Sequence, residues 1–373
     1  MGRPALASMG VASGDSFPRD RRILIYRLGS LGDTVVALPG LRLIERAFPN
    51  HERWLLTNFS PSRKVAPMAS VLEGTGLVHG YLQYPLGLRA FADSLRLRRA
   101  IRELRPEVLV YLVGSRGRLK AWRDAMFFRW CGIHRLIGVP YTLDQQRPRR
   151  LDRGLYEYEG ARLVRCLHEL GHQDLDAPEA FDLSLSDTEH RAATGALGSL
   201  GDGRPLLIAS IGAQVDVKDW GDAPWRALLE RLTDRLPGWS LAMIGSAEER
   251  SRSESLLYHW RGPRVNLCGT LTVRESAAVL THARIYLGHD SGPTHLAAAV
   301  GKPCVVVFSS RNLPGEWFPY GSGHRVVYHN ISCQGCQLEL CVEREKACIR
   351  SITVEEVELR VLELSGRYAA PTP

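Results

Sequence analysis

Residues 285–308 read IYLGHDSGPTHLAAAVGKPCVVVF. An apolar stretch over 285–287 leads into a polar turn, a helix of small residues follows over 294–300, and a second apolar stretch spans 304–308. This order predicts two parallel strands joined by a crossover helix. Strands that are apolar throughout lie in sheets covered by helices on both faces. The stretch therefore predicts an α/β fold.

The same alternation of short apolar strands and amphipathic helices runs through most of the chain. Between Phe181 and Pro205 it loosens into Ser, Asp, Thr and Gly, and afterwards it restarts. We therefore expect a loose tail over 1–20, a first domain over 21–190 and a second over 204–373. The strands predicted besides those above are 22–26, 54–56, 107–113, 206–210 and 241–244, and the helices are 38–48, 88–104, 225–236, 274–281 and 354–365.

Length and composition agree with two folded domains. The chain has 373 residues, of which 45% are hydrophobic and 24% charged, and this excludes disordered, collagen-like and coiled-coil proteins. The longest apolar runs are far shorter than the roughly 20 residues needed to cross a bilayer. No apolar segment of a secretory signal occurs in the first twenty residues. We therefore expect a soluble, cytoplasmic protein.

Positive charge is concentrated in one region. The whole chain carries a formal charge of +8, whereas residues 85–153 alone hold sixteen Lys and Arg against six Asp and Glu. Such a region attracts phosphate groups of nucleic acid, anionic lipid or a phosphorylated substrate, and it is equally typical of solvated helix faces. No RNA-binding aromatic pattern or zinc-finger spacing accompanies it, which disfavours nucleic acid.

The first predicted strand runs into Arg27-Leu28-Gly29-Ser30-Leu31-Gly32-Asp33-Thr34. Glycines here allow a sharp turn and close approach to a ligand. Their G-x-x-G spacing is not the G-x-G-x-x-G of dinucleotide-binding folds, which argues against a nicotinamide enzyme. Asp33 has two interpretations: a helix cap, or a carboxylate at the edge of the sheet where α/β proteins bind ligands.

Two later turns can bind an anion. Lys218 follows the strand over 206–210, where it is either a phosphate ligand or a surface lysine. In the turn after 285–287, Asp290 and Ser291 can cap the next helix, with Pro293 at its first position. The positive start of that helix suits a diphosphate. His295 either reaches the same ligand or is a structural histidine.

Four of the eight cysteines lie within sixteen residues, at Cys333, Cys336, Cys341 and Cys348. A zinc site and a pair of disulfides are both compatible with this clustering. The gaps between them are not those of paired C-x-x-C hooks, and a reducing compartment disfavours disulfides. We therefore expect a structural role. The other four, expected to be core thiols, are Cys131, Cys166, Cys268 and Cys304.

Together these segments resemble glycosyltransferase family 9, which contains the bacterial lipopolysaccharide heptosyltransferases. The similar parts are ILIYRLGSLGDTVVALP over 23–39, Lys218-Asp219-Trp220, Asp290-Ser291-Gly292-Pro293-Thr294-His295-Leu296, Pro319-Tyr320-Gly321 and the cysteine cluster. The resemblance implies a GT-B fold, with two Rossmann-like domains whose parallel sheets face each other across the active-site cleft. It also implies that the last helix packs back across the first domain.

The resemblance also assigns roles to residues. Asp33 would be the general base, and Lys218 would meet the diphosphate of the donor. Asp290, Ser291, Gly292 and His295 would line the donor site in the second domain. Further donor contacts are expected from Gln214, from Leu271 and, at the nucleotide ribose, from Glu248. On the acceptor side the expected residues are Ser30, Gly32, Arg116 and Lys120.

The implied reaction is inverting transfer of heptose or a related sugar. The donor is a nucleoside-diphosphate sugar, and the acceptor is lipopolysaccharide or another phosphorylated, lipid-linked or polysaccharide glycan. We expect no cofactor and no essential metal, and a place at the cytoplasmic face of the inner membrane. The alternative is a GT-B scaffold that binds such ligands without catalysis. The chain departs from the family at Ser309-Ser310-Arg311-Asn312, where many members have Gly-Pro-Thr, and at Ala213 and Gln214, where some have hydroxyl side chains.

Overall fold

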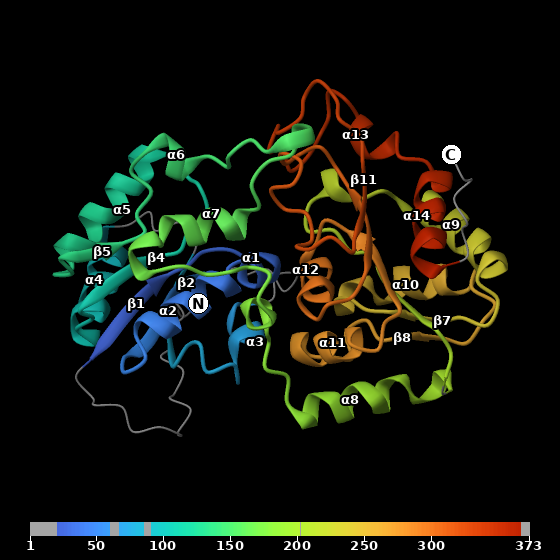
Figure 1. The fold of residues 1–373 in the computed structure, drawn as a ribbon, viewed down its shortest axis with the longest axis horizontal. Coiled ribbons are helices and arrows are strands. Elements are labelled where there is room, and N and C mark those ends of the chain that lie inside the picture. The colour runs from blue at the N-terminus through green and yellow to red at the C-terminus, as the bar shows by residue number, and fades with distance from the viewer. Residues whose placement is uncertain (1–20, 60–66, 86–90, 202, 367–373) are drawn as a thin grey trace. The chain divides into compact units, whose positions relative to one another are not determined.

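A computed structural model describes residues 21–59, 67–85, 91–201 and 203–366. The chain forms two compact units, the first ending at Asp182 and the second beginning at Leu183. The ribbon of Figure 1 shows helices and strands alternating in both, as the sequence predicts. The expected loose tail over 1–20 lies outside the described residues.

Unit 1 is built on a sheet of five parallel strands in the order β3-β2-β1-β4-β5. The central strand places Ile25 between Leu55 and Val110, and its residues 23–25 are fully buried. The strands are β1 (Arg22–Tyr26), β2 (Glu52–Phe59), β3 (Gly80–Pro85), β4 (Val108–Tyr111) and β5 (Arg135–Ile137). The α-helices are α1 (Leu31–Val36), α2 (Leu38–Ala47), α3 (Ala69–Leu72), α4 (Phe91–Leu104), α5 (Arg118–Trp130), α6 (Leu143–Gln146) and α7 (Glu159–Cys166).

Unit 2 is built on a sheet of six parallel strands in the order β11-β10-β9-β6-β7-β8. Its core holds Trp225 and Trp260, both almost completely buried. The strands are β6 (Leu206–Ser210), β7 (Ser240–Met243), β8 (Arg264–Asn266), β9 (Ile285–His289), β10 (Cys304–Phe308) and β11 (Arg325–Tyr328). The α-helices are α8 (Asp187–Leu197), α9 (Asp222–Arg235), α10 (Arg250–Leu257), α11 (Val273–Leu280), α12 (Gly292–Ala299), α13 (Ala347–Arg350) and α14 (Val354–Ser365).

Each sheet has one point at which the strand order reverses. In unit 1 the chain starts in β1, adds β2 and β3 on one side and β4 and β5 on the other. In unit 2 it starts in β6, adds β7 and β8 on one side and β9 to β11 on the other. The loops after the two strands at such a point run to opposite faces and leave a crevice, which is where open α/β sheets bind ligands. The fold class predicted from the sequence, two Rossmann-like domains, is confirmed.

The division between the units differs from the expected linker. We expected the first domain to reach residue 190 and a linker to follow, whereas α8 belongs to unit 2. It packs against α11, where Arg274 forms an ion pair with Glu189 and donates to the carbonyl of Leu183 at 2.9 Å. The capping box of Ser186 and Glu189, which starts α8, was the available signal for this helix.

The last helix, α14, has the predicted bounds. It packs on α9 and on the sheet of unit 2, with Val357 and Val361 fully buried in that core. Arg231 of α9 pairs with Glu358 at 2.7 Å. Apolar and ionic contacts therefore hold α14 on its own unit. Of the helices that the structure describes, none is both long and apolar enough to cross a membrane.

Candidate active site

An ion pair occupies the reversal point of the unit 2 sheet. Lys218 lies in the loop after β6, Asp290 follows β9, and these two strands are neighbours at the point where the order reverses. Lys218 Nζ is 2.8 Å from Asp290 Oδ2, and the two side chains are 15% and 4% exposed. The structure thus brings together two of the predicted donor residues and places a lysine ammonium where such folds bind ligands.

The segment that departs from the family supports the same pair. Asn312 is buried after β10, and its Nδ2 donates to Asp290 Oδ2 at 3.4 Å. Gln337 Nε2 in turn donates to Asn312 Oδ1 at 3.2 Å. Ser309-Ser310-Arg311-Asn312 therefore takes part in fixing Asp290. Sequence reasoning noted this segment as different and did not place Asn312 in the site.

Helix α12 begins beside Asp290. Ser291 is its N-cap with an extended backbone, its hydroxyl donates to the carbonyl of His289 at 3.4 Å, and the helix starts at Gly292. The side chain of Ser291 makes no capping hydrogen bond, contrary to expectation, and Pro293 is the second helical residue instead of the first. His295 is buried with its ring 6.3 Å from that of Trp317.

Ion pairs from two sides fix the loop that carries Lys218. Arg252 of α10 forms two 2.9 Å hydrogen bonds with the carboxylate of Asp219. Burial raises the pKa of Asp219, but the contacts with Arg252 outweigh it and hold this pKa below its usual value. From the other side, Lys346 Nζ lies 3.0 Å from Asp216 Oδ1. Lys218 therefore projects from a loop held at the residues on both sides of it.

His289 is a second residue of the site that sequence reasoning did not select. Its ring is fully buried at the end of β9, and Nε2 accepts hydrogen bonds of 3.1 Å from the backbone N–H of Trp220 and from Trp225 Nε1. Burial lowers the pKa of His289 to about 4. The neutral ring therefore ties the Lys218 loop to the strand that carries Asp290.

Glu249, the neighbour of the predicted Glu248, lies against the backbone at the edge of the sheet. Its carboxylate fills the space in which a Cβ on Gly212 or on Gly245 would lie, and it accepts a 2.9 Å hydrogen bond from the N–H of Ser246. Glu248 is exposed on the same short turn after β7. Two glycines thus leave room for a carboxylate next to the Lys218 loop.

The two remaining donor-side candidates lie at the same edge of the sheet, each after a different strand. Gln214 is exposed in the loop after β6. Leu271 is half-buried after β8 and precedes Thr272, the N-cap of α11. All the predicted donor residues therefore follow carboxyl ends of the unit 2 strands, and Lys218 and Asp290 form an ion pair with each other.

In unit 1, Asp33 belongs to the first turn of α1, directly after β1. Ser30 is the N-cap, and Asp33 Oδ2 accepts hydrogen bonds from the Ser30 N–H at 2.7 Å and from its hydroxyl at 2.9 Å. The backbone of Gly29 has φ of +129°, and a Cβ there would collide with the carboxylate. Gly32 is buried within the helix. Asp33 therefore takes part in capping the helix through its Oδ2 atom, as the third helical residue of a capping box.

The other oxygen of Asp33 faces a buried arginine. Asp33 Oδ1 lies 3.9 Å from Arg27 Nη2, and the carboxylate is 32% exposed while Arg27 is 2% exposed. Arg27 also donates to the backbone carbonyl of Asp33 and, at 2.9 Å, to that of Leu112 after β4. Burial lowers the pKa of Arg27, and the nearby Asp33 and Glu159 oppose this effect. Arg27 thus links the loops after β1 and β4, the two strands at the reversal point.

Arg116 lies in a network of aromatic hydroxyls and a carboxylate. Its Nη1 is 3.3 Å from Tyr26 Oη and 3.2 Å from Asp124 Oδ2, which also accepts from Tyr111 Oη at 3.0 Å. Burial lowers the pKa of Arg116, but Tyr26 and Asp124 more than offset it and raise the pKa overall. Lys120, the other predicted acceptor-side cation, is exposed on α5.

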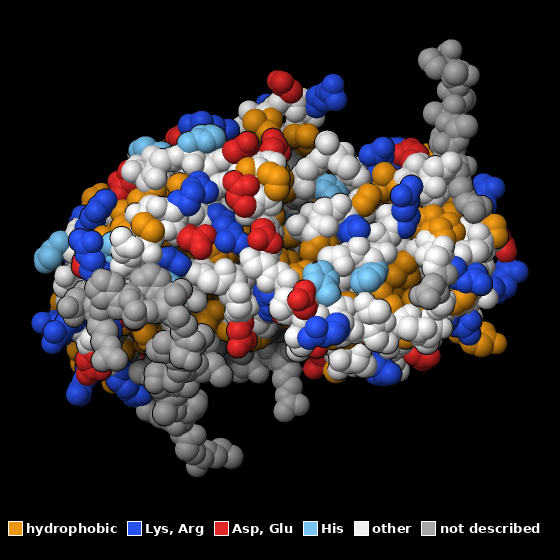
Figure 2. Space-filling view, turned by 60° about the horizontal axis from the view of Figure 1, so that its bottom comes forward, with side chains coloured by type: hydrophobic (Ala, Val, Ile, Leu, Met, Phe, Trp, Pro, Cys, Tyr) orange, Lys and Arg blue, Asp and Glu red, His pale blue; other side chains and the backbone are white. Residues whose placement is uncertain are grey.

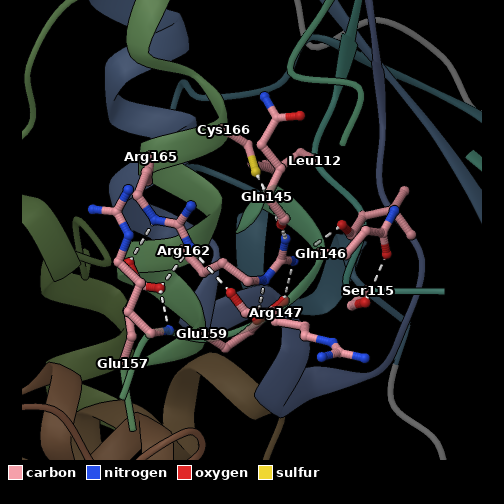
Figure 3. Close-up of polar contacts among 12 residues, drawn as sticks. Leu112, Ser115, Gln145, Gln146, Arg147, Glu157, Glu159, Arg162, Arg165 and Cys166 are labelled. Carbon is pink, nitrogen blue, oxygen red and sulfur yellow. Dashed lines mark hydrogen bonds and ion pairs between the residues drawn. The ribbon is translucent and has the colours of Figure 1, made fainter. Parts of the chain in front are cut away.

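A buried ion pair supports the loop after β4 (Figure 3). Arg162 of α7 is completely buried and contacts both carboxylate oxygens of Glu159 at 2.6 and 2.7 Å. Arg162 also donates to the carbonyl of Gln145, and Gln146 Oε1 accepts from Ser115 Oγ at 2.7 Å and from the N–H of Gly117 at 3.0 Å. Helices α6 and α7 therefore hold both sides of Arg116 in place.

The cysteines behave as thiols. All eight are free, and those outside the cluster are buried as predicted. Burial raises the pKa of Cys348, with a contribution from the nearby Cys333 and Cys336. Of the residues that the structure describes, no group of three or more His, Cys, Asp or Glu is arranged to hold a metal ion.

Comparison with known proteins explains why these elements occur together. The sequence pattern of glycosyltransferase family 9 (heptosyltransferase) matches residues 119–347. The chain belongs to glycosyltransferase family 9. It is therefore a glycosyltransferase, and the predicted resemblance is confirmed.

Relatives of this family 9 enzyme span most of its length. Lipopolysaccharide heptosyltransferase 1 of Pseudomonas aeruginosa is 28% identical over 341 residues, which are 86% of this chain and 87% of the relative. The crystal structure of a glycosyltransferase family 9 protein from Veillonella parvula superposes with a TM-score of 0.69 at 16% identity, covering 96% of this chain and all of the other. The structure of the E. coli ADP-heptose lipopolysaccharide heptosyltransferase II superposes with a TM-score of 0.62 at 19% identity. The alignment covers 92% of this chain and 98% of the E. coli chain. These structures show that the fold is shared.

Proposed function

We propose that this family 9 enzyme transfers a heptose from ADP-heptose to the growing core of lipopolysaccharide, with inversion at the anomeric carbon. Support comes from the relative in Pseudomonas aeruginosa, a lipopolysaccharide heptosyltransferase aligned over most of both chains. A related E. coli heptosyltransferase, covering 92% of this chain at a TM-score of 0.58, has been solved with ADP-2-deoxy-2-fluoro heptose.

The observation that carries the proposal is the Lys218–Asp290 pair at the reversal point of the unit 2 sheet. A diphosphate needs positive charge as its bond to the sugar breaks. Lys218 Nζ and the N–H of Gly292 at the positive start of α12 supply it from the same edge of the sheet. Because the first residue of α12 is Gly292, no side chain at that position blocks the approach of a phosphate to the helix start. Gln214, Leu271 and Glu248 follow neighbouring strands and are proposed to contact the nucleotide and the sugar.

Asp33 is proposed to activate the acceptor. The acceptor hydroxyl gives its proton to Asp33 Oδ1, and its oxygen forms a bond to the anomeric carbon as the bond from that carbon to the diphosphate oxygen breaks. The capping box leaves Oδ1 available because the hydrogen bonds from Ser30 both go to Oδ2. Arg116 and Lys120 are proposed to meet phosphate groups of the acceptor. With charge supplied by Lys218 and α12, we expect no essential metal.

We further propose that the enzyme works at the cytoplasmic face of the inner membrane. Its acceptor is anchored in lipid, and the region from 85 to 153 carries a large excess of positive charge. An anionic bilayer attracts such a region without any membrane-spanning segment.

Thermal unfolding with different donors tests the proposal first. ADP-heptose should raise the melting temperature more than GDP-, UDP- or TDP-sugars at equal concentration, because a ligand that binds the folded state stabilises it. Turnover is then measured with ADP-heptose and a lipopolysaccharide core that lacks the heptose to be added. A larger stabilisation by another nucleotide sugar would change the proposed donor, and release of ADP without growth of the glycan would refute the proposed acceptor.

A further inference from the structure

Helix α5 has apolar side chains on two opposite faces. One face, made of Ala121, Ala125 and Phe128, is buried in the core of unit 1. The other carries four large apolar side chains that are 42% to 86% exposed, Leu119, Trp122, Met126 and Trp130. Their spacing of three, four and four residues places them in one stripe along the helix. At 1.5 Å per residue the stripe is about 16 Å long.

Helix α4 continues this exposed apolar surface. Phe91, at the start of α4, is 72% exposed, and its ring stacks on that of Trp130 at 6.4 Å between centroids. Leu95, one turn further along, is also exposed. Contiguous exposed apolar side chains of this size mark a binding surface in a soluble domain, because they gain free energy when covered. We name these six side chains the α4–α5 stripe.

Arginines surround the stripe. Arg98 lies over the ring of Trp130 at 4.5 Å and donates to its backbone carbonyl at 3.0 Å. Arg99 pairs with Glu103 and Arg123 with Asp124, whereas none of the ion pairs among the described residues involves Arg98, Arg102, Arg118 or Arg129. Figure 2 shows Lys and Arg side chains interspersed with hydrophobic ones at its left-hand end, where Figure 1 places α4 and α5.

A basic depression adjoins the stripe on the α4 side. It has a volume of about 600 Å³, and Arg98 belongs to both surfaces. Part of this charge is balanced by Glu103, which pairs with Arg99, and by Glu52, which pairs with Arg22 at 2.7 Å. The depression is lined by Arg22, Arg98, Arg99, Arg102, Glu103 and Arg105. Its size and charge suit phosphate groups that arrive together with an apolar partner.

We propose that the α4–α5 stripe and its arginines form a docking surface for an anionic lipid bilayer. Trp, Phe, Leu and Met side chains enter the boundary between head groups and acyl chains, and tryptophan is enriched at that depth in membrane proteins. The arginines reach the phosphates of the surface with their guanidinium groups while their aliphatic parts stay with the apolar layer. The choice of partner rests on the proposed lipid-linked acceptor, and the surface itself rests on exposure and charge.

The charge of the surface favours an anionic bilayer over a second copy of this chain and over a nucleic acid. Two copies of this chain meeting through the stripe would bring Arg98, Arg102 and Arg129 close to the same arginines of the other copy, and like charges facing each other oppose association. The phosphates of a nucleic acid would bind the arginines, but its polar surface would leave the apolar side chains of the α4–α5 stripe without an apolar partner. An anionic bilayer satisfies both parts of the surface.

Binding to vesicles tests the docking surface. The full chain is sedimented with vesicles of phosphatidylcholine alone and with vesicles of equal parts of phosphatidylcholine and phosphatidylglycerol. We expect binding to the anionic vesicles and much weaker binding to the neutral ones, with a loss as salt rises from 0.1 to about 1 M because the screening length falls from about 10 to 3 Å. Equal binding to both vesicles would refute the role of the arginines.

Variants locate the surface. Trp122→Ser and, separately, the double change Leu119→Ser/Met126→Ser should each weaken binding to anionic vesicles about tenfold or more, because apolar burial at the interface is lost. The matched control is Tyr258→Ser, which removes a side chain that is 79% exposed in unit 2, and it should bind as the parent does. Parent-like binding by both stripe variants would overturn the proposal.

Two further readouts separate the possible failures. If the parent binds no vesicles and is instead a dimer that Trp122→Ser dissociates, the stripe contacts a second copy and the proposal is wrong. Turnover of a water-soluble acceptor without acyl chains should be equal in the parent and in Trp122→Ser. Vesicle binding without turnover would support the docking surface and refute the proposed reaction. Turnover without vesicle binding would support the reaction and refute the docking surface.

Discussion

Lys218 and Asp290 form a 2.8 Å ion pair that joins the loop after β6 to the turn before α12. The carboxylate is almost completely buried, and Asn312 holds its same oxygen. A diphosphate that binds Lys218 therefore meets an ammonium whose position is already fixed. The pair restricts the lysine side chain, and less side-chain freedom is lost on binding as a result.

Lys218→Ala should weaken binding of ADP by roughly tenfold to a hundredfold, because it removes a charge-assisted contact worth about 1.5–3 kcal/mol. Isothermal titration calorimetry gives the affinity, and Lys302→Ala, a change at another lysine of unit 2, is the control. An unchanged affinity for ADP would mean that Lys218 has only the structural role of pairing with Asp290.

Asp33→Asn should lower turnover by about 10²–10⁴-fold, the usual contribution of a general base. The amide oxygen of Asn can still accept the hydrogen bond from the Ser30 N–H, so the helix start and the melting temperature should change little. ADP affinity should also be retained. Steady-state kinetics compares the variant with Asp33→Ala, which loses the cap as well. Turnover within a few-fold of the parent in the Asn variant would leave capping as the whole role of Asp33.

Replacing Cys333 and Cys336 by Ser should lower the melting temperature more than it lowers turnover of the folded fraction. These half-buried thiols lie near the buried Cys348, and a hydroxyl in place of a thiol packs less favourably against it. Calorimetric melting and kinetics are measured on the same preparation. A large loss of turnover with an unchanged melting curve would assign the cysteines to the reaction.

The stability of the fold should decrease as the pH falls from about 6.5 to about 4. Folding lowers the pKa of His289 to about 4, so in this range the unfolded chain binds a proton that the folded chain excludes. At 1.36 kcal/mol per pKa unit the loss reaches about 3 kcal/mol at the lower limit. Denaturant unfolding at several pH values measures it. His289→Gln keeps an acceptor for Trp225 and cannot titrate, so its pH dependence should be shallower, and an identical slope would contradict the assignment to His289.

The sequence predicted those features that depend on local pattern. Apolar runs predicted the core strands of both sheets. The polar turns after these strands contain Lys218 and Asp290, and the family resemblance implied their roles at the donor. The sequence divides α8 between the first domain, which it predicts to end at residue 190, and the linker that follows, because the helix is stabilised by a distant partner, Arg274.

Features that depend on distant contacts were not predictable in the same way. Asn312 reaches Asp290 from another strand, and His289 binds two tryptophans that lie more than sixty residues away. The contact of the Glu249 carboxylate with Gly212 likewise depends on how the turn after β7 folds, and the neighbouring Glu248 stays the predicted ribose contact. The two apolar faces of α5 cannot be told apart by spacing alone, since burial of one face depends on the sheet beneath it.

The carboxylate of Glu249 takes up the volume in which side chains of Gly212 and Gly245 would begin. The three positions are consequently coupled, because a side chain at either glycine requires the Glu249 carboxylate to be shortened or turned away. Gly212→Ala should therefore displace the Glu249 carboxylate and break its hydrogen bond with the N–H of Ser246, and Glu249→Ala should make the same glycine substitution easier to accommodate. A family member with a larger residue at either glycine should carry a compensating change at the glutamate.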